Sequence, residues 1–148
     1  EALLKQIHHI TRHQPEMLWH LTTSRRTPEN FLSSLLNLKL PNVQAVSHDQ
    51  VDTDWLPGHL SQSSQVWVTP DSASMVYEAL TSGADVGCFG QPARKPGRVA
   101  KGLQRLINEN RVTEFSHWER LGTLQPNPRP LNESARCAET LLSCLTKK

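Results

Sequence analysis

The stretch at residues 65–90, QVWVTPDSASMVYEALTSGADVGCFG, constrains the fold more than any other part of the chain. It opens with a short β-branched and aromatic run at residues 66–68 and breaks at a Thr-Pro pair. Apolar residues then recur at helical spacing from Ala73, and Gly83 ends that pattern before a second apolar run at residues 86–89. This order predicts a strand, a polar loop, a helix and a second buried strand.

Small polar residues stand between this first strand and its helix, namely Asp71, Ser72 and Ser74. Hydroxyls and free backbone N–H groups at a helix N-terminus, where about half a positive charge is available, favour an anion such as phosphate. Glu78 follows Ser74 by four residues on the same helical face, and its two acceptor oxygens suit a pair of sugar hydroxyls. The alternative is that Asp71 or Ser72 is an ordinary N-cap and Glu78 a solvated helix residue.

A second turn with affinity for anions is predicted at residues 23–27, TSRRT, between a strand at residues 17–23 and the next helix. Thr27 is expected to be the N-cap of that helix, with Pro28 at its first position and Glu29 in its first turn. Guanidinium groups match phosphate oxygens in geometry, and the alternative is a solvated basic turn. Both turns follow strands, and ligands bind at that edge of an open parallel sheet. The candidate ligands of this turn are Ser24, Arg25, Arg26 and Thr27.

The remaining chain alternates helices and strands. Helices are expected at residues 1–13, around Trp55, from Arg98 and from Asn132, and strands at residues 43–47 and 112–115. A proline-held segment at residues 125–130 crosses between the last strand and the last helix. We therefore predict a three-layer, Rossmann-like α/β domain with a mainly parallel sheet of about five strands. For both turns to serve one ligand, the strand order should be 2-1-3-4-5.

Composition excludes several classes of protein. The 148 residues have a formal charge of +2, a hydrophobic content of 36% and a mean hydropathy of −0.50, which is typical of one soluble globular domain. No apolar run approaches the roughly 20 residues of a membrane span. A basic run between Arg94 and Arg105 lacks interleaved aromatic residues, so we expect no nucleic-acid partner.

The cysteine and histidine patterns point to neither a disulfide framework nor a metal site. Cys88 lies in an apolar strand, and Cys137 and Cys144 are seven residues apart on a predicted helix, about 10 Å along its axis. Reduced, structural thiols favour a reducing compartment, so we expect a cytoplasmic protein. His9 and His13 are spaced to face a metal, but no carboxylate or cysteine is placed to complete a site, so no metal is expected.

Three segments of the sequence resemble a known family. They are TTSRRTP (residues 22–28), VTPDSASMVYEALTSGADV (68–86) and PLNESARCA (130–138). They look like the C-terminal half of the elongated-mitochondria (ELM), mitochondrial-fission family, whose bacterial relatives are often labelled predicted nucleoside-diphosphate-sugar epimerases. The resemblance covers nearly the whole chain. More distantly, the layout is similar to the donor-binding domain of GT-B glycosyltransferases.

The resemblance to GT-B enzymes implies roles for individual residues. Ser24, Arg25 and Arg26 match the loop that binds the diphosphate, and Ser72 and Ser74 match the helix start that shares this role. The acidic residue that binds the ribose corresponds to Glu78, and Asp85 departs from a proline often found at that point of the pattern. The first turn lacks the glycines of a dinucleotide fingerprint, so we expect no cofactor, and the nucleotide-diphosphate sugar would be a substrate.

The same resemblance implies a two-domain parent. The chain begins inside a helical pattern without an initiator Met, so we expect residues 1–148 to be one nucleotide-sugar-binding domain, the C-terminal half of a longer protein. Its partner would be the missing N-terminal domain. The protein would associate with a membrane only through that domain. No catalytic residue can be assigned without that half, and the isolated domain should be inactive. The alternative function is a non-catalytic GT-B-like scaffold that binds a protein partner.

Overall fold

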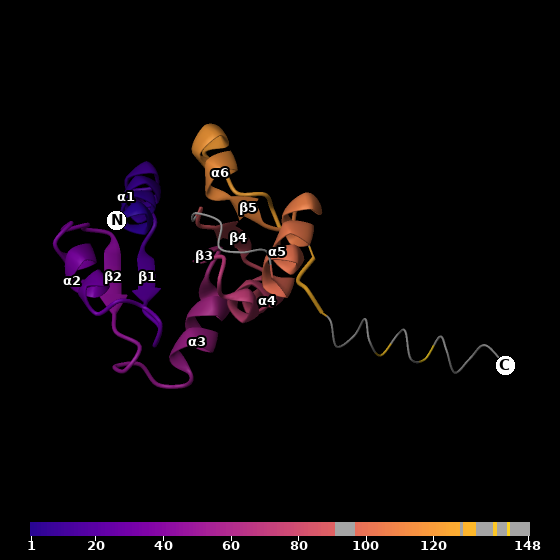
Figure 1. Cartoon of the computed structure of the whole chain (residues 1–148), viewed down its shortest axis with the longest axis horizontal. Helices are drawn as coiled ribbons and strands as arrows, with labels where there is room; N and C mark the ends of the chain where they lie inside the picture. Colours follow the sequence, from indigo (N-terminus) through magenta and orange to yellow (C-terminus); the bar gives the residue numbers. More distant parts are fainter. Residues whose placement is uncertain (91–96, 128, 133–137, 139–141, 143–148) are drawn as a thin grey trace.

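The chain folds into a layered α/β arrangement of short parallel strands and amphipathic helices (Figure 1). The computed structural model describes residues 1–90, 97–127, 129–132, 138 and 142. Within these residues, no helix has both the length and the apolar character needed to cross a membrane. In chain order the elements are α1 (Ala2–His13), β1 (Trp19–Thr22), α2 (Asn30–Leu36), β2 (Val43–Val46), α3 (Trp55–Gln62), β3 (Gln65–Val68), α4 (Ala73–Ser82), β4 (Asp85–Cys88), α5 (Arg98–Asn108), β5 (Thr113–Glu114) and α6 (Phe115–Leu121).

The strands pair in parallel within two small sheets. One sheet is β1 beside β2, with Trp19 opposite Val43, and the other has β4 between β3 and β5, with Val66 opposite Val86. In the described part of the chain no backbone ladder joins β1 to β3, so the single sheet of about five strands is not seen. Figure 1 shows the two sheets lying apart, with α3 connecting β2 to β3.

The first core is aliphatic and lies between one face of the three-stranded sheet and the helices α3, α4 and α5. Side chains alternate across a strand, so Val66 and Val68 of β3 face this core while Trp67 faces the opposite side. Its buried members are Leu60, Val68, Val76, Ala79, Leu80, Val86, Cys88, Leu106 and Val112. The helices that follow β2, β3 and β4 along the chain therefore cover the same face.

The second core is aromatic and joins the two sheets through side chains. Trp67 packs against Phe89, Phe115 and Trp118, with ring centroids 5.4, 6.2 and 5.4 Å apart. Trp19 of β1 packs against the same cluster, which α1, α2 and α6 cover. Its buried members are Ile7, Ile10, Leu35, Phe89, Phe115, Trp118 and Leu124. Packing of this cluster, in place of a backbone ladder, connects β1 to β3.

Glycine fixes two features of the central unit. Helix α4 begins at Ala73 and ends before Gly83, as predicted, because Gly83 adopts the left-handed conformation with φ of 91°. Gly87 of β4 lies against the indole of Trp67, and a Cβ at this position would be 2.5 Å from its ring carbons. The aromatic core therefore depends on glycine at position 87, because any side chain there would collide with Trp67.

Several predicted boundaries need correction. The strand expected at residues 112–115 is shorter, because Phe115 already begins α6, a helix the sequence reading missed. Phe115 and Trp118 are three residues apart and both buried, which is helical spacing. Helix α2 begins at Asn30 and not at Pro28. Most of the helix expected after Asn132 and the cysteines Cys137 and Cys144 lie outside the described residues, as do Arg94 and Lys95.

Candidate functional site

The first predicted turn is a closed hydrogen-bonded loop at the end of β1. The backbone N–H of Ser24 donates to Thr27 Oγ1 at 2.9 Å, and the N–H of Thr27 donates to the Ser24 carbonyl at 2.9 Å. The N–H of Arg26 donates to Ser24 Oγ at 3.2 Å. Both hydroxyls therefore satisfy backbone groups of their own turn, while Arg25 and Arg26 are exposed.

The expectation that Thr27 caps the following helix is wrong. Thr27 binds the backbone of Ser24, and Glu29 occupies the cap position of α2 without a side-chain hydrogen bond. Because α2 has only seven residues, its dipole adds little to the attraction for an anion at this turn. The positive charge of this turn comes from its two arginines alone.

The second predicted turn leads into α4. Ser72 occupies the cap position, and neither its hydroxyl nor any other side chain caps the helix. The N–H groups of the first turn of α4 thus have no side-chain acceptor among the described residues. Ser74 and Glu78 are both exposed on α4, as their spacing predicts, and neither makes a hydrogen bond or ion pair with a described residue.

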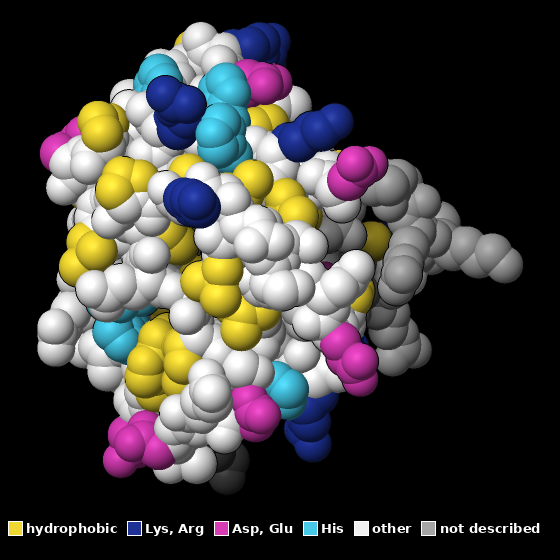
Figure 2. All heavy atoms as spheres, turned by 90° about the vertical axis from the view of Figure 1, so that its left-hand side faces the viewer, with side chains coloured by type: hydrophobic (Ala, Val, Ile, Leu, Met, Phe, Trp, Pro, Cys, Tyr) yellow, Lys and Arg dark blue, Asp and Glu magenta, His cyan; other side chains and the backbone are white. Residues whose placement is uncertain are grey.

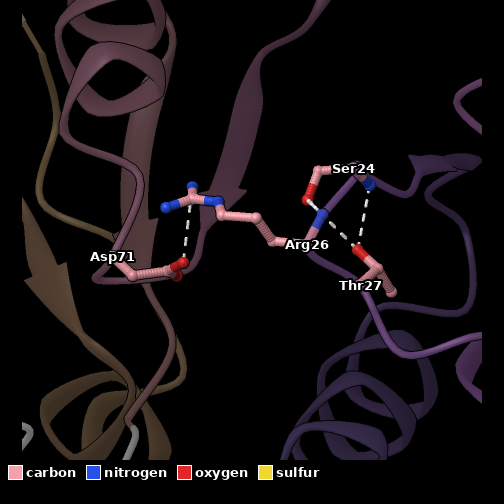
Figure 3. Close-up of polar contacts among 4 residues, drawn as sticks. All are labelled: Ser24, Arg26, Thr27 and Asp71. Carbon is pink, nitrogen blue, oxygen red and sulfur yellow. Dashed lines mark hydrogen bonds and ion pairs between the residues drawn. The ribbon is translucent and has the colours of Figure 1, made fainter.

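An ion pair brings the two turns together. Arg26 Nη2 lies 3.4 Å from Asp71 Oδ2, and Figure 3 shows the arginine reaching across from the Ser24–Thr27 turn to the loop before α4. The side chains are 64% and 46% exposed, so solvent screens the pair strongly. The Arg25 side chain makes no hydrogen bond or ion pair with a described residue, which leaves one guanidinium group unpaired beside the bound one.

Further polar groups lie at the same ends of the strands. The N–H of His48, which follows β2, donates to Thr23 Oγ1 at 3.0 Å and so ties the loop after β2 to the loop after β1. Burial first, and then the nearby carboxylates of Glu114 and Asp71, together raise the pKa of the Cys88 thiol at the end of β4 to about 12. The thiol stays protonated at neutral pH, so Cys88 is no nucleophile.

The carboxyl-end edge can therefore hold an anion, with one carboxylate already present. We use this name for Thr23, the Ser24–Thr27 turn, His48, Asp71 and the start of α4. Arg25 and Arg26 supply two guanidinium groups, and α4, ten residues long, directs its free N–H groups to this side. The structure brings Arg26 and Asp71 into contact, whereas among the described residues no hydrogen bond or ion pair joins Ser74 or Glu78 to the first turn.

The histidines form two other groups. His20 of β1 lies against His59 of α3 with ring centroids 4.4 Å apart, and the His59 ring lies 4.1 Å from that of Trp55. Burial first, and the charge of His59 second, lower the pKa of His20. On α1, the rings of His9 and His13 pack against Trp118 at 5.7 and 5.3 Å.

An open hollow of about 280 Å³ is lined by the side chains of His8, His9, Arg12 and His13. Figure 2 shows histidine and basic side chains gathered at one end of this face of the molecule, with apolar side chains dispersed below them. Among the described residues, no group of three or more His, Cys, Asp or Glu side chains is placed to hold a metal ion. His9 and His13 serve the packing of α1 on α6.

Sequence reasoning missed a polar group on the opposite edge. Asn127, in the proline-held segment, donates its side-chain amide to the carbonyls of Leu80 and Ala84 at 3.0 and 3.1 Å. Its own N–H donates to Asp85 Oδ1 at 2.7 Å, which gives Asp85 a structural role. The sequence signal for this role was an asparagine that stands between two prolines. The side-chain amide of an asparagine can donate to the free carbonyls at a helix end.

Comparison with known families gives one match. The family model described as mitochondrial fission ELM1 matches residues 1–145, nearly the whole chain. No curated protein and no solved structure matches the sequence.

Proposed function

The chain belongs to the mitochondrial fission ELM1 family, and on that premise we propose that it binds a nucleotide-diphosphate sugar at the carboxyl-end edge. The observation that carries this proposal is the contact of 3.4 Å between Arg26 and Asp71. It joins the loop after β1 to the loop after β3, so a ligand that spans these two loops meets the arginines on one side and the start of α4 on the other. A diphosphate has the charge and the length for such a position.

Each group has a role in this proposal. Arg25 and Arg26 bind the diphosphate oxygens, and the free N–H groups of α4 after Ser72 bind them from the other side. Glu78, one turn further along the exposed face of α4, accepts hydrogen bonds from the ribose hydroxyls. In a glycosyl transfer, the same cations would stabilise the diphosphate as it leaves. No residue of this chain is assigned as a base.

The proposal includes a GT-B-like donor domain with strand order 2-1-3-4-5. Its support is the pairing of β2 with β1 and of β3 with β4 and β5, together with the position of α3, whose His59 lies against His20 of β1 while its Leu60 packs in the first core. A helix that leaves β2 and crosses β1 before β3 fits that order. A second domain, the predicted N-terminal partner, would supply the acceptor side. The buried thiol of Cys88 suits the cytoplasm.

One observation favours the alternative of a non-catalytic scaffold. The hydroxyls of Ser24 and Thr27 are bound within their own turn, and Arg26 is bound to Asp71, so three of the proposed ligands already have partners. In a scaffold these contacts would serve only to shape the surface that a protein partner recognises. The two functions differ in whether a nucleotide stabilises the fold.

Thermal unfolding in the presence of UDP-, GDP- and ADP-sugars tests the proposal. A ligand that binds only the folded chain raises the midpoint of unfolding, and at 100 times its Kd it adds about 2.7 kcal/mol to the stability. We expect one of these nucleotides to raise the midpoint, and Arg25→Ala and Glu78→Ala each to remove most of the shift.

Glu119→Ala is the matched control, because it removes an exposed carboxylate from α6 and not from α4. This variant should keep the full shift. If no nucleotide changes the midpoint of a chain that unfolds cooperatively, the nucleotide-binding proposal is wrong and the scaffold is favoured.

A further inference from the structure

The Arg26–Asp71 ion pair has a consequence for any ligand of the proposed site. Both side chains belong to the carboxyl-end edge, and the Asp71 carboxylate lies where an anion bound to Arg26 would place an oxygen. A carboxylate and a phosphate oxygen make the same kind of charge-assisted hydrogen bond to a guanidinium group. They therefore compete for Arg26.

We infer that Asp71 is an internal competitor of the ligand: its carboxylate holds Arg26 in the free protein and must be displaced when a diphosphate binds. This inference rests on the proposed function, because it concerns the same site. It changes the role predicted for Asp71 from that of a ligand-binding residue to that of a residue that lowers affinity.

The exposure of the pair supports displacement. At 64% and 46% exposure, the ion pair is screened by water and is weak, so a ligand that offers several phosphate oxygens replaces it readily. Arg25 makes no hydrogen bond or ion pair with a described residue and is available to the same ligand without competition. The two adjacent arginines thus differ. Arg25 has no ion-pair partner among the described residues, whereas Arg26 is paired with Asp71 until a ligand displaces the carboxylate.

The backbone around Arg26 supports the inference as well. The N–H of Arg26 is fixed by Ser24 Oγ, and the turn is closed by the bond between Thr27 and Ser24, so the Cα of Arg26 does not have to move for its side chain to change partner. Releasing Asp71 requires only rotation of two exposed side chains. The exchange therefore leaves the fold unchanged.

Isothermal titration of the 148-residue chain with inorganic pyrophosphate and with UDP tests this inference. Asp71→Asn keeps the shape of the side chain and removes its charge, so we expect it to bind both ligands about two- to five-fold more tightly than the wild type, the range given by the strength of exposed ion pairs. Asp54→Asn is the control, since Asp54 is an exposed residue whose side chain makes no hydrogen bond or ion pair with the described residues. It should leave the affinity unchanged.

Arg26→Ala separates competition from simple repulsion. Competition acts through Arg26, so Asp71→Asn should bring no gain in an Arg26→Ala background, or binding should be lost there altogether. An equal gain in that background, or no gain in the wild-type background, overturns the inference. If the wild type binds while Asp71→Asn shows no gain, the proposed function stands; if no variant binds pyrophosphate or UDP, this inference fails, and the proposed function is decided by the thermal shifts with the UDP-, GDP- and ADP-sugars. Thermal unfolding of each free variant verifies that it is folded.

Discussion

The two edges of the sheets are both rich in polar side chains, but these side chains have different partners. The amino-end edge, where the strands begin, includes Asn42 and Asn127. Both bind backbone carbonyls of neighbouring segments, and Asn127 is only 8% exposed. At the carboxyl-end edge, Arg26 and Asp71 bind each other and are largely exposed. Contacts join segments of the fold at both edges, but those of Asn127 are buried, whereas those of Arg26 and Asp71 are exposed to solvent.

Burial determines what each edge can do. A buried carbonyl that loses its donor has no water to replace it, so the amino-end contacts are structural. An exposed ion pair exchanges its partners with solvent at little cost, so the carboxyl-end contacts are available to a ligand. The difference predicts that substitutions at one edge change stability and substitutions at the other change binding.

The largest expected effect on stability is that of Asn127→Ala. The substitution removes two hydrogen bonds, leaves the carbonyl of Ala84 without this donor and opens a small cavity, while the carbonyl of Leu80 still accepts from the N–H of Leu131. We expect the free energy of unfolding to fall by about 2–3 kcal/mol. Urea denaturation followed by circular dichroism measures this loss.

Asn30→Ala serves as the control for Asn127→Ala. Asn30 is the exposed first residue of α2, and its side chain makes no hydrogen bond with a described residue. We expect its substitution to change stability by less than about 0.5 kcal/mol. Equal losses for the two variants would contradict the view that burial distinguishes the amino-end edge.

Asn42→Ala is expected to have the next largest effect. Its side-chain amide lies 3.0, 3.3 and 3.1 Å from the carbonyls of Thr11, Gln14 and Met17, where α1 ends and the chain turns toward β1. Because Asn42 is only partly buried, water replaces part of what is lost, and we expect a cost of about 1–2 kcal/mol. In the Asn42→Ala variant, amide hydrogen exchange should become faster in α1 than in α4. Exchange that becomes equally faster in both helices would argue against a local role for Asn42.

Local signals made the central unit predictable from sequence. The helical spacing after Ala73 and the glycine at position 83 gave α4 with its correct ends. The rule that loops of a parallel sheet meet at one edge agrees with the contact of Arg26 with Asp71. The ligand-binding roles of Ser24, Arg25, Ser74 and Glu78 stay predictions.

Features that depend on distant partners were not predictable. Asn127 binds main-chain carbonyls more than forty residues away. Because every residue has a backbone carbonyl, the sequence does not indicate which of them Asn127 binds. The aromatic core depends on how Trp67 packs against Gly87 and Phe89, which no periodicity encodes. The ion pair of Asp71 with Arg26 was not predictable either, since nothing in the sequence around Asp71 reveals that Arg26 faces it. The ligand-binding role of Asp71 stays a prediction.

A third prediction concerns His20, which lies on β1 between the two edges. Burial and then the charge of His59 lower its pKa from the ordinary value of 6.5, so the folded chain binds fewer protons than the unfolded chain just below that value. The stability linked to His20 is therefore present above pH 6.5 and decreases as the pH falls toward the folded pKa. An NMR titration should give a midpoint below 6.5 that rises in His59→Gln; a midpoint unchanged by this substitution would exclude the effect of His59.

The smallest expected effect is the coupling between Arg26 and Asp71 in the stability of the free chain. Exposed ion pairs contribute about 0.2–1 kcal/mol, and salt screens them. A double-mutant cycle of Arg26→Ala and Asp71→Ala, measured by urea denaturation, should therefore give a coupling free energy in this range. The coupling should be smaller in 0.5 M NaCl. A coupling above about 2 kcal/mol would mean that the pair holds the two sheets together. The carboxyl-end edge would then be structural like the amino-end edge, and Asp71 would be too firmly bound for a ligand to displace.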